Sequence, residues 1–192
     1  MGQDKALLPH PEGGCWLERT LLLLAALDSP VTLVSHHPSH LPVAMGLAER
    51  GGWGDRLERL VEPEPRAGPL LALARLMEHH PNQRLLLCPV DMPWLRPETL
   101  AALVAAPTAP TAILVAHDGE RRQTLLGLYP SDGRHRAAIG AATAAGERRL
   151  QRWIATVGCQ ELDLPPETLR NANGPDDAAP LWGGTPDAME RP

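Results

Sequence analysis

The segment that most constrains the fold is an apolar run at residues 84–95, Arg-Leu-Leu-Leu-Cys-Pro-Val-Asp-Met-Pro-Trp-Leu. A short apolar run bounded by breakers is typical of a strand buried on both faces, as in a parallel α/β sheet. The run ends on one carboxylate, Asp91, at the end of the strand where open α/β sheets have their crevice. Asp91 is therefore a candidate ligand for a divalent metal that faces a phosphorylated ligand. The alternative is a surface turn that caps the helix starting at Pro97.

The length and charge of the chain narrow the class of protein. With 192 residues, the chain fits one domain with a sizeable core. We expect this domain to cover residues 1–179, because residues 180–192 combine Gly, Pro and charge as in a disordered tail. The net charge of −5 and the lack of a basic run with interleaved aromatic residues argue against a nucleic-acid partner.

The cysteines and the hydropathy pattern predict where the protein works. Cys15, Cys88 and Cys159 are odd in number and widely spaced, which indicates a reducing compartment without a disulfide framework or zinc knuckle. No stretch reaches transmembrane length, and the first residues lack the apolar core of a signal peptide. We expect a cytoplasmic protein that does not bind membranes.

Breakers divide the chain into alternating helical and strand-like segments. Helices are expected within residues 12–27 and at 43–50, 70–77, 97–104, 135–145 and 148–156. Strands are expected at 31–35, 59–62, 84–91, 111–116, 123–129 and 159–164. Asp118-Gly119 between two strand-like runs predicts a hairpin, with one antiparallel strand at the edge of the sheet.

Three further places carry residues that suit a phosphorylated ligand. Lys5 lies in a short loop, and its point charge suits phosphate, although a merely solvated lysine is the alternative. Gly68 precedes a helix that begins with Pro69, so its backbone could approach an anion at the helix start; a plain loop-to-helix junction is the alternative. Asn171 and Asn173 could hydrogen-bond a ligand or only their own turn.

A histidine-rich segment, His36-His-Pro-Ser-His40, follows the strand expected at 31–35. Its composition resembles a metal site, but its spacing matches no standard ligand pattern. We therefore expect a polar loop at the strand end, with metal binding as the alternative.

Five motifs occur in one order over nearly the whole chain. They are Met1-Gly-Gln-Asp-Lys-Ala-Leu-Leu8, Ala67-Gly-Pro-Leu70, Cys88-Pro-Val-Asp-Met-Pro93, His117-Asp-Gly-Glu-Arg121 and Asn171-Ala-Asn-Gly-Pro-Asp176. Together they resemble the molybdenum cofactor guanylyltransferase family. The Gly-x-Asp-Lys and Asp-x-Pro pieces are shared with related cytidylyl- and nucleotidyltransferases, whereas Asp-Gly-Glu-Arg and Asn-x-Asn favour the molybdopterin branch.

The resemblance implies both a fold and a reaction. The fold is a doubly wound, Rossmann-like α/β domain with a mostly parallel sheet, of the nucleotide-diphospho-sugar transferase type. The reaction is the transfer of GMP from GTP to molybdenum-bound molybdopterin, with release of pyrophosphate and with Mg²⁺ as the cofactor. Whether a cofactor carrier or target enzyme also docks is left open.

The resemblance also assigns roles to the candidate residues. Lys5 would hold the phosphates of GTP and Asp91 would bind the metal, so that these two residues are the catalytic ones. Gly68 would lie near the nucleotide, and Asn171 and Asn173 would face the pterin substrate or the metal region. The chemistry agrees, because nucleotidyl transfer depends mainly on positioning and on neutralised charge, and an anionic attacking phosphate needs no dedicated base.

Two departures from the family pattern stand out. In the family, a first strand and a glycine-rich Leu-Ala-Gly-Gly-x-Ser-x-Arg loop precede the Met-Gly-x-Asp-Lys stretch, whereas this sequence begins at Met1. We therefore expect a central strand to be missing, neighbouring strand edges to be exposed, and Met1 to be an internal methionine of a longer protein. In addition, Ser35 or His36 and Glu62 or Pro63 occupy the places of a nucleotide-contacting asparagine and an aspartate, so these two places do not support guanine selectivity.

Two other functions remain open from the sequence. One is a nucleotidyltransferase with another base or acceptor, such as the cytidylyl branch, which GTP and CTP as co-substrates would distinguish. The other is a non-catalytic α/β remnant that binds a nucleotide or partner without turnover, because the glycine-rich loop is absent.

Overall fold

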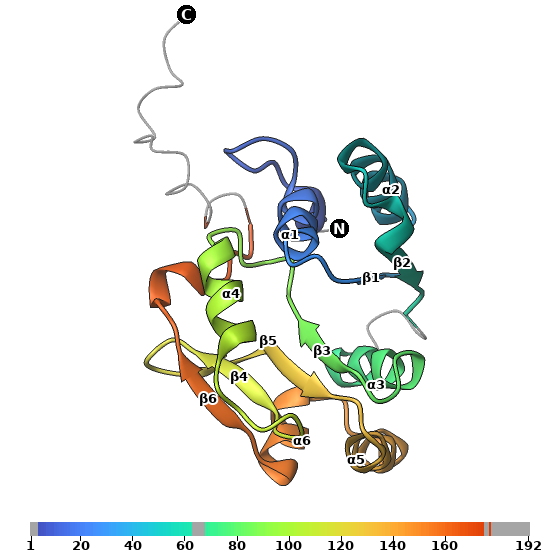
Figure 1. Cartoon of the computed structure of the whole chain (residues 1–192), viewed down its shortest axis with the longest axis vertical. Coiled ribbons are helices and arrows are strands. Elements are labelled where there is room, and N and C mark those ends of the chain that lie inside the picture. The colour runs from blue at the N-terminus through green and yellow to red at the C-terminus, as the bar shows by residue number, and fades with distance from the viewer. Residues whose placement is uncertain (1–3, 63–67, 175–176, 178–192) are drawn as a thin grey trace, which may run out of the picture.

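The computed structural model describes residues 4–62, 68–174 and 177, and these form an α/β structure (Figure 1). The helices are α1 (Trp16–Ala25), α2 (His40–Gly51), α3 (Pro69–His79), α4 (Pro97–Ala105), α5 (Gly133–Ala144) and α6 (Leu150–Val157). The strands are β1 (Val31–Val34), β2 (Leu57–Leu60), β3 (Arg84–Leu87), β4 (Leu114–His117), β5 (Arg122–Pro130) and β6 (Gln160–Asp163). Short 3-10 helices are η1 (Lys5–Leu7), η2 (Gly54–Arg56) and η3 (Pro166–Thr168). The tail expected at 180–192 lies outside the described residues.

The strands form two sheets. β1 and β2 pair in parallel, and the second sheet has the order β3-β5-β4-β6. Both β3 and β4 run antiparallel to β5, and β6 runs parallel to β4, so β3, β4 and β6 share one direction. The prediction of an α/β fold is confirmed, and β5 is the strand that makes the sheet mixed.

The hairpin predicted at Asp118-Gly119 is present, but its antiparallel strand is not at the edge of the sheet. β5 pairs with β4 on one side and with β3 on the other. Most side chains of β5 are buried, as expected of a strand with neighbours on both edges and helices on both faces. The turn predicts that β4 and β5 pair with each other. It does not predict that β3 pairs with the other edge of β5.

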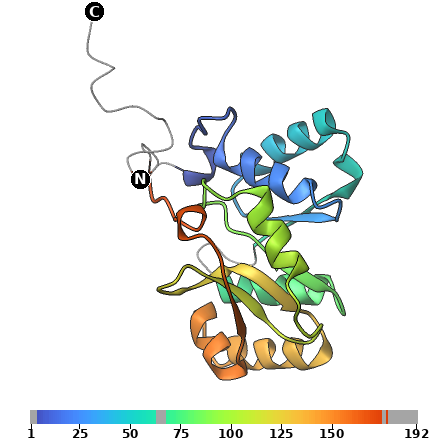
Figure 2. The same ribbon diagram turned by 60° about the vertical axis from the view of Figure 1, so that its left-hand side comes forward.

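Helices cover both faces of the four-stranded sheet (Figure 2). On one face, α4 packs on alternate residues of β4, with Leu100 and Leu103 in one cluster with Leu114 and Ala116. The intervening residue Val115 points to the other face, where the side chains of α3, α5 and α6 form a second cluster. This alternation is the two-residue period of a strand, and it makes the domain doubly wound.

The described strands do not form one continuous sheet. Among the described residues, β1 is paired only with β2, and β3 is paired only with β5. The small β1–β2 sheet has its own apolar cluster, in which Val31 meets Leu17 and Leu21 of α1 and Ala44 and Ala48 of α2. The expected break between neighbouring strands is therefore present in the structure.

The strand expected at 84–91 ends earlier than expected. β3 stops at Leu87, and Asp91 lies in the turn that leads towards α4. Cys88, Pro89 and Val90 separate Leu87 from Asp91, and proline cannot donate a hydrogen bond to a neighbouring strand. Asp91 thus projects from a loop beyond the carboxyl end of the strand.

Within the described ranges, none of the helices combines the length and apolar character needed to cross a bilayer.

Candidate functional site

Three segments far apart in the sequence meet beyond the carboxyl end of β3. They are the start of η1, the turn that holds Asp91, and the loop at residues 171–173. The Lys5 ammonium donates a hydrogen bond of 2.8 Å to the side-chain oxygen of Asn173. The backbone N–H of Ala172 donates a bond of 2.9 Å to the carbonyl oxygen of Asp91. The structure thereby brings together Lys5, Asp91 and the 171–173 loop that carries both predicted asparagines.

Buried apolar contacts anchor these three segments. Leu8, Trp16 and the fully buried Ala172 form one cluster, and Trp94 packs against it. A buried hydrogen bond of 3.1 Å joins the His10 ring to the carbonyl oxygen of Pro93. Because apolar packing fixes the backbone next to Lys5 and next to Asp91, these polar side chains are held by the fold and not only by each other.

Asp91 is a half-buried carboxylate with a cation close by. Burial raises its pKa, and the nearby Lys5 ammonium opposes that rise. A half-buried carboxylate next to one cation is stabilised further by any second cation that approaches it. Cys88 lies behind it, and burial together with the Asp91 charge raises the pKa of this thiol to about 12. Cys88 is therefore a neutral thiol near pH 7 and a poor metal ligand or nucleophile.

Asp91 and Asn171 line a cavity of about 110 Å³, and a larger cavity of about 420 Å³ adjoins it. The two cavities share Arg122, Thr124 and Gln151, so they form one depression beside the Asp91 turn. No motif in the sequence predicted these three residues. The available signal was the His117–Arg121 motif, because this motif leads directly into Arg122, and Glu120 and Arg121 also line the larger cavity.

Gly68 has a packing role at the start of α3. Its φ of +88° lies in the region that favours glycine, and a Cβ at this position would meet the Arg148 carbonyl oxygen at 3.0 Å. The nearest atoms to such a Cβ all belong to Arg148, which lies before α6. The structure thus gives Gly68 a reason that involves no ligand, and its contact with a nucleotide stays a prediction.

The two places that depart from the family pattern lie side by side. β1 and β2 are parallel and pair Val34 with Leu60, so the residues that follow them emerge at the same edge. There the His36 ring and the Glu62 carboxylate interact at 2.5 Å. Ser35 is buried and points elsewhere, to His40. Pro63 lies outside the described residues.

Comparisons with known proteins agree on one family. The profile of the MobA-like NTP transferase domain matches residues 1–162. A probable molybdenum cofactor guanylyltransferase of Rhodopirellula baltica is 30% identical, over 96% of this chain and 87% of its own length. A probable enzyme of the same name from Synechococcus elongatus is 33% identical, over 92% of this chain and 89% of its own.

Solved structures show the same fold at lower sequence identity. Molybdopterin-guanine dinucleotide biosynthesis protein A from Archaeoglobus fulgidus has a TM-score of 0.63 and 17% identity, over 95% of this chain and 90% of its own. A protein of Aquifex aeolicus has a TM-score of 0.65 and 18% identity, over 82% and 78%. The domain match over residues 1–162 and the curated relatives show that the chain belongs to the molybdenum cofactor guanylyltransferases, a family of nucleotidyltransferases with a MobA-like NTP transferase domain.

Proposed function

We propose that this protein transfers GMP from GTP to molybdenum-bound molybdopterin and releases pyrophosphate. The observation that carries the proposal is the pairing of Lys5 with Asn173 beside the Asp91 turn. The proposal is supported because Lys5, Asp91 and the two asparagines lie beyond the carboxyl end of β3, the end of a strand at which open α/β sheets bind nucleotides. The names of the curated relatives supply the identity of the two substrates.

Lys5 and the 171–173 loop would bind different substrates. The Lys5 ammonium is a point charge that can bind the phosphates of GTP once its bond to Asn173 is exchanged for them. Asn171 lines the cavity beside Asp91, and its amide could hydrogen-bond the pterin. A phosphate acceptor is already anionic near neutral pH, so positioning and charge neutralisation are the main tasks of these residues.

Transferases of this family generally use a divalent metal, and we assign Asp91 to Mg²⁺. The residue fits, because burial disfavours its charged form and a cation would compensate for this. Mg²⁺ typically takes one or two protein carboxylates and completes its shell with water and substrate phosphates. When bound, it would neutralise charge on the phosphates of GTP.

The depression lined by Arg122, Thr124 and Gln151 is the proposed place of the acceptor. It begins at the Asp91 and Asn171 cavity and continues into the larger one. Arg122 is paired with Glu161 at 2.5 Å, so its guanidinium is fixed at the rim where an anionic substrate would enter.

All three cysteines are free, which suits a reducing compartment such as the cytoplasm.

The deciding experiment measures pyrophosphate release with GTP or CTP, each with Mg²⁺ and molybdenum-molybdopterin. Turnover with GTP and little with CTP supports the proposal. Preference for CTP would assign the chain to the cytidylyl branch. The His36–Glu62 pair would then deserve mutation, because it occupies the two places that depart from the family pattern. Calorimetry with each nucleotide separates binding from turnover, and a folded protein that binds neither would refute the proposal.

A further inference from the structure

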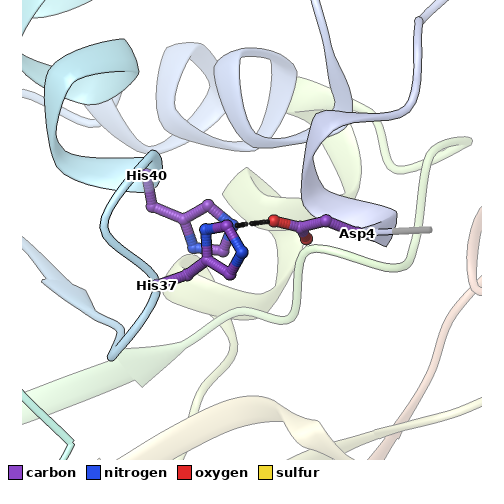
Figure 3. Close-up of side chains that lie close together, drawn as sticks. All are labelled: Asp4, His37 and His40. Carbon is purple, nitrogen blue, oxygen red and sulfur yellow. Dashed lines mark hydrogen bonds and ion pairs between the residues drawn. The ribbon is translucent and has the colours of Figure 1, made fainter. Parts of the chain in front are cut away.

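A second set of polar side chains gathers next to Lys5 but does not include Asp91 (Figure 3). It contains Asp4, which directly precedes η1, and His37 and His40, which follow β1. Each offers one ligand atom, and these atoms all lie within 4.8 Å of one another. All three residues are partly buried. We refer to them as the Asp4–His37–His40 cluster.

The two distances from Asp4 to the histidines are close to those of a metal site. The Asp4 carboxylate oxygen Oδ2 lies 2.8 Å from His40 Nε2 and 3.4 Å from His37 Nδ1. In a tetrahedral zinc site with bonds of about 2.0–2.1 Å, neighbouring ligand atoms lie about 3.3 Å apart. The Asp4–His37 pair already has this separation, and the Asp4–His40 pair needs to open by only about 0.5 Å. Figure 3 shows both rings beside the same carboxylate.

The surroundings of the cluster hold these ligands in place. The buried hydroxyl of Ser35 lies 2.7 Å from His40 Nδ1, the ring nitrogen that does not face Asp4. The same hydroxyl accepts a bond of 3.0 Å from the backbone N–H of His37. The other Asp4 oxygen, Oδ1, accepts a bond of 3.1 Å from the backbone N–H of Ala6. Metal-binding histidines typically have such a partner on the second ring nitrogen, because it fixes the tautomer and the ring plane.

The types of ligand in the cluster indicate which kind of metal it would bind. Mg²⁺ prefers oxygen ligands, whereas imidazole suits Zn²⁺ and its first-row neighbours. Two imidazoles and one carboxylate are three of the four ligands of a tetrahedral site, and they leave one position open to water. We propose that Asp4, His37 and His40 bind a transition-metal ion of the Zn²⁺ type, at a site that shares no ligand with Asp91.

The proposed site would link two parts of the chain that lie at the same edge. Asp4 precedes Lys5, while His37 and His40 belong to the segment between β1 and α2. A bound ion would therefore fasten the start of η1, and with it Lys5, to the small β1–β2 sheet. The site does not depend on the transfer reaction, because its ligands and its test involve neither GTP nor the pterin.

A second histidine cluster in the described part of the chain provides a matched control. Glu58, His79 and His80 also lie within metal-ligand reach of one another, but Glu58 and His79 are exposed. In this cluster His80 Nε2 lies 2.8 Å from the Thr32 hydroxyl and 3.8 Å from Glu58, so its contact with another partner is shorter than its contact with the carboxylate. His37 Nδ1 also has a second partner, but the bond that it accepts from the Ser39 backbone N–H is long, at 3.4 Å. His79→Asn removes a histidine of the same kind at a place where we expect no bound ion.

The test is titration of the metal-free protein with Co²⁺, followed by its visible spectrum, and with Zn²⁺, followed by calorimetry and thermal unfolding. We expect one Co²⁺ with the intense bands of a tetrahedral site, and a higher Tm with Zn²⁺, in both the wild type and His79→Asn. His37→Asn should weaken binding by more than about tenfold, and Ser35→Ala by about tenfold, since outer partners alone are worth 10–100-fold.

Two outcomes would overturn the assignment. One is a wild-type protein without stoichiometric Zn²⁺ or with only the weak spectrum of octahedral Co²⁺. The other is unchanged affinity in both His37→Asn and Asp4→Asn. Asp4→Asn keeps an oxygen for the Ala6 N–H and removes the charge, and His37 is partly exposed, so neither variant depends on tolerance of a core change. The Tm without metal verifies that each variant is folded.

Discussion

Lys5 and Asn173 lie 168 positions apart in the sequence, yet their side chains form a hydrogen bond of 2.8 Å. The neighbour of Asn173, Ala172, is fully buried and bonds to the Asp91 carbonyl oxygen. Residues near the start and the end of the domain therefore meet at the turn that holds Asp91. Replacement of Lys5, Asp91 or Asn173 should therefore also change how the other two residues contribute to binding or turnover.

Lys5→Ala should weaken GTP binding by roughly 10- to 100-fold, because a hydrogen bond to a charged group is worth about 1.5–3 kcal/mol. Calorimetry with GTP and Mg²⁺ measures this directly. Lys5→Arg is the matched control, since it keeps the positive charge, and we expect a smaller loss. Unchanged affinity in Lys5→Ala would mean that this lysine is only solvated.

Asn173→Asp should raise the KM for GTP by about fivefold. The new carboxylate would lie against the Lys5 ammonium, and a partly exposed ion pair of this kind is worth up to about 1 kcal/mol, which GTP must then overcome. High salt should reduce the effect, because it screens exposed charges. Asn173→Ala lacks the charge and serves as the control. Equal KM values in both variants would argue against competition for Lys5.

Asp91→Asn should lower kcat by about a hundredfold or more, because loss of a metal-bound charge costs several kcal/mol of transition-state stabilisation. The same variant should unfold at a higher temperature near pH 7. Burial raises the pKa of Asp91, so its charged form is less stable in the folded protein than in the unfolded chain, and this cost disappears with asparagine. Exposed Asp55 provides the control Asp55→Asn, for which neither change is expected.

The sequence indicated the segments that meet beyond β3, because each candidate residue lies next to a recognisable break. Lys5 precedes the first apolar run, and Asp91 is the first carboxylate after β3. The two asparagines were ambiguous, since asparagine in a turn usually serves only the turn. In the structure Asn173 bonds to Lys5, a contact that no local pattern could have indicated, and its contact with a substrate stays a prediction.

Sheet order and the Asp4–His37–His40 cluster could not be predicted for a common reason. Both depend on contacts between segments far apart in the sequence. The segment His36–His40 alone has no standard ligand spacing, and the third ligand is Asp4, more than 30 positions away. Likewise, the Asp118-Gly119 turn predicts the pairing of β4 with β5, whereas the pairing of β5 with β3 joins segments distant in the sequence and has no such local signal.

Gly68→Ala should destabilise the fold by about 1–3 kcal/mol, since alanine is strained at a φ of +88° and its Cβ would meet the Arg148 carbonyl at 3.0 Å. Gly146→Ala is the control: its φ is +86°, but nothing lies within 4 Å of its Cβ. Urea unfolding should show the larger loss for Gly68→Ala. Equal losses would mean that the Arg148 contact costs nothing. A raised KM for GTP in folded Gly68→Ala would support the nucleotide role.

Asp118 should make the hairpin between β4 and β5 sensitive to acid. Although burial raises its pKa, hydrogen bonds from the backbone of Arg121, the side chain of Gln123 and the backbone of Glu120 lower it to about 2. Because the folded pKa lies below the unfolded value, the stabilisation is complete above about pH 4 and is lost as the pH falls from about 4 to about 2. Asp118→Ala should therefore cost about 1–2 kcal/mol at pH 7 and progressively less below pH 4. Urea unfolding of both proteins from pH 7 to pH 3 measures the difference, and a difference that stayed constant over this range would show that the Asp118 charge has no part in it.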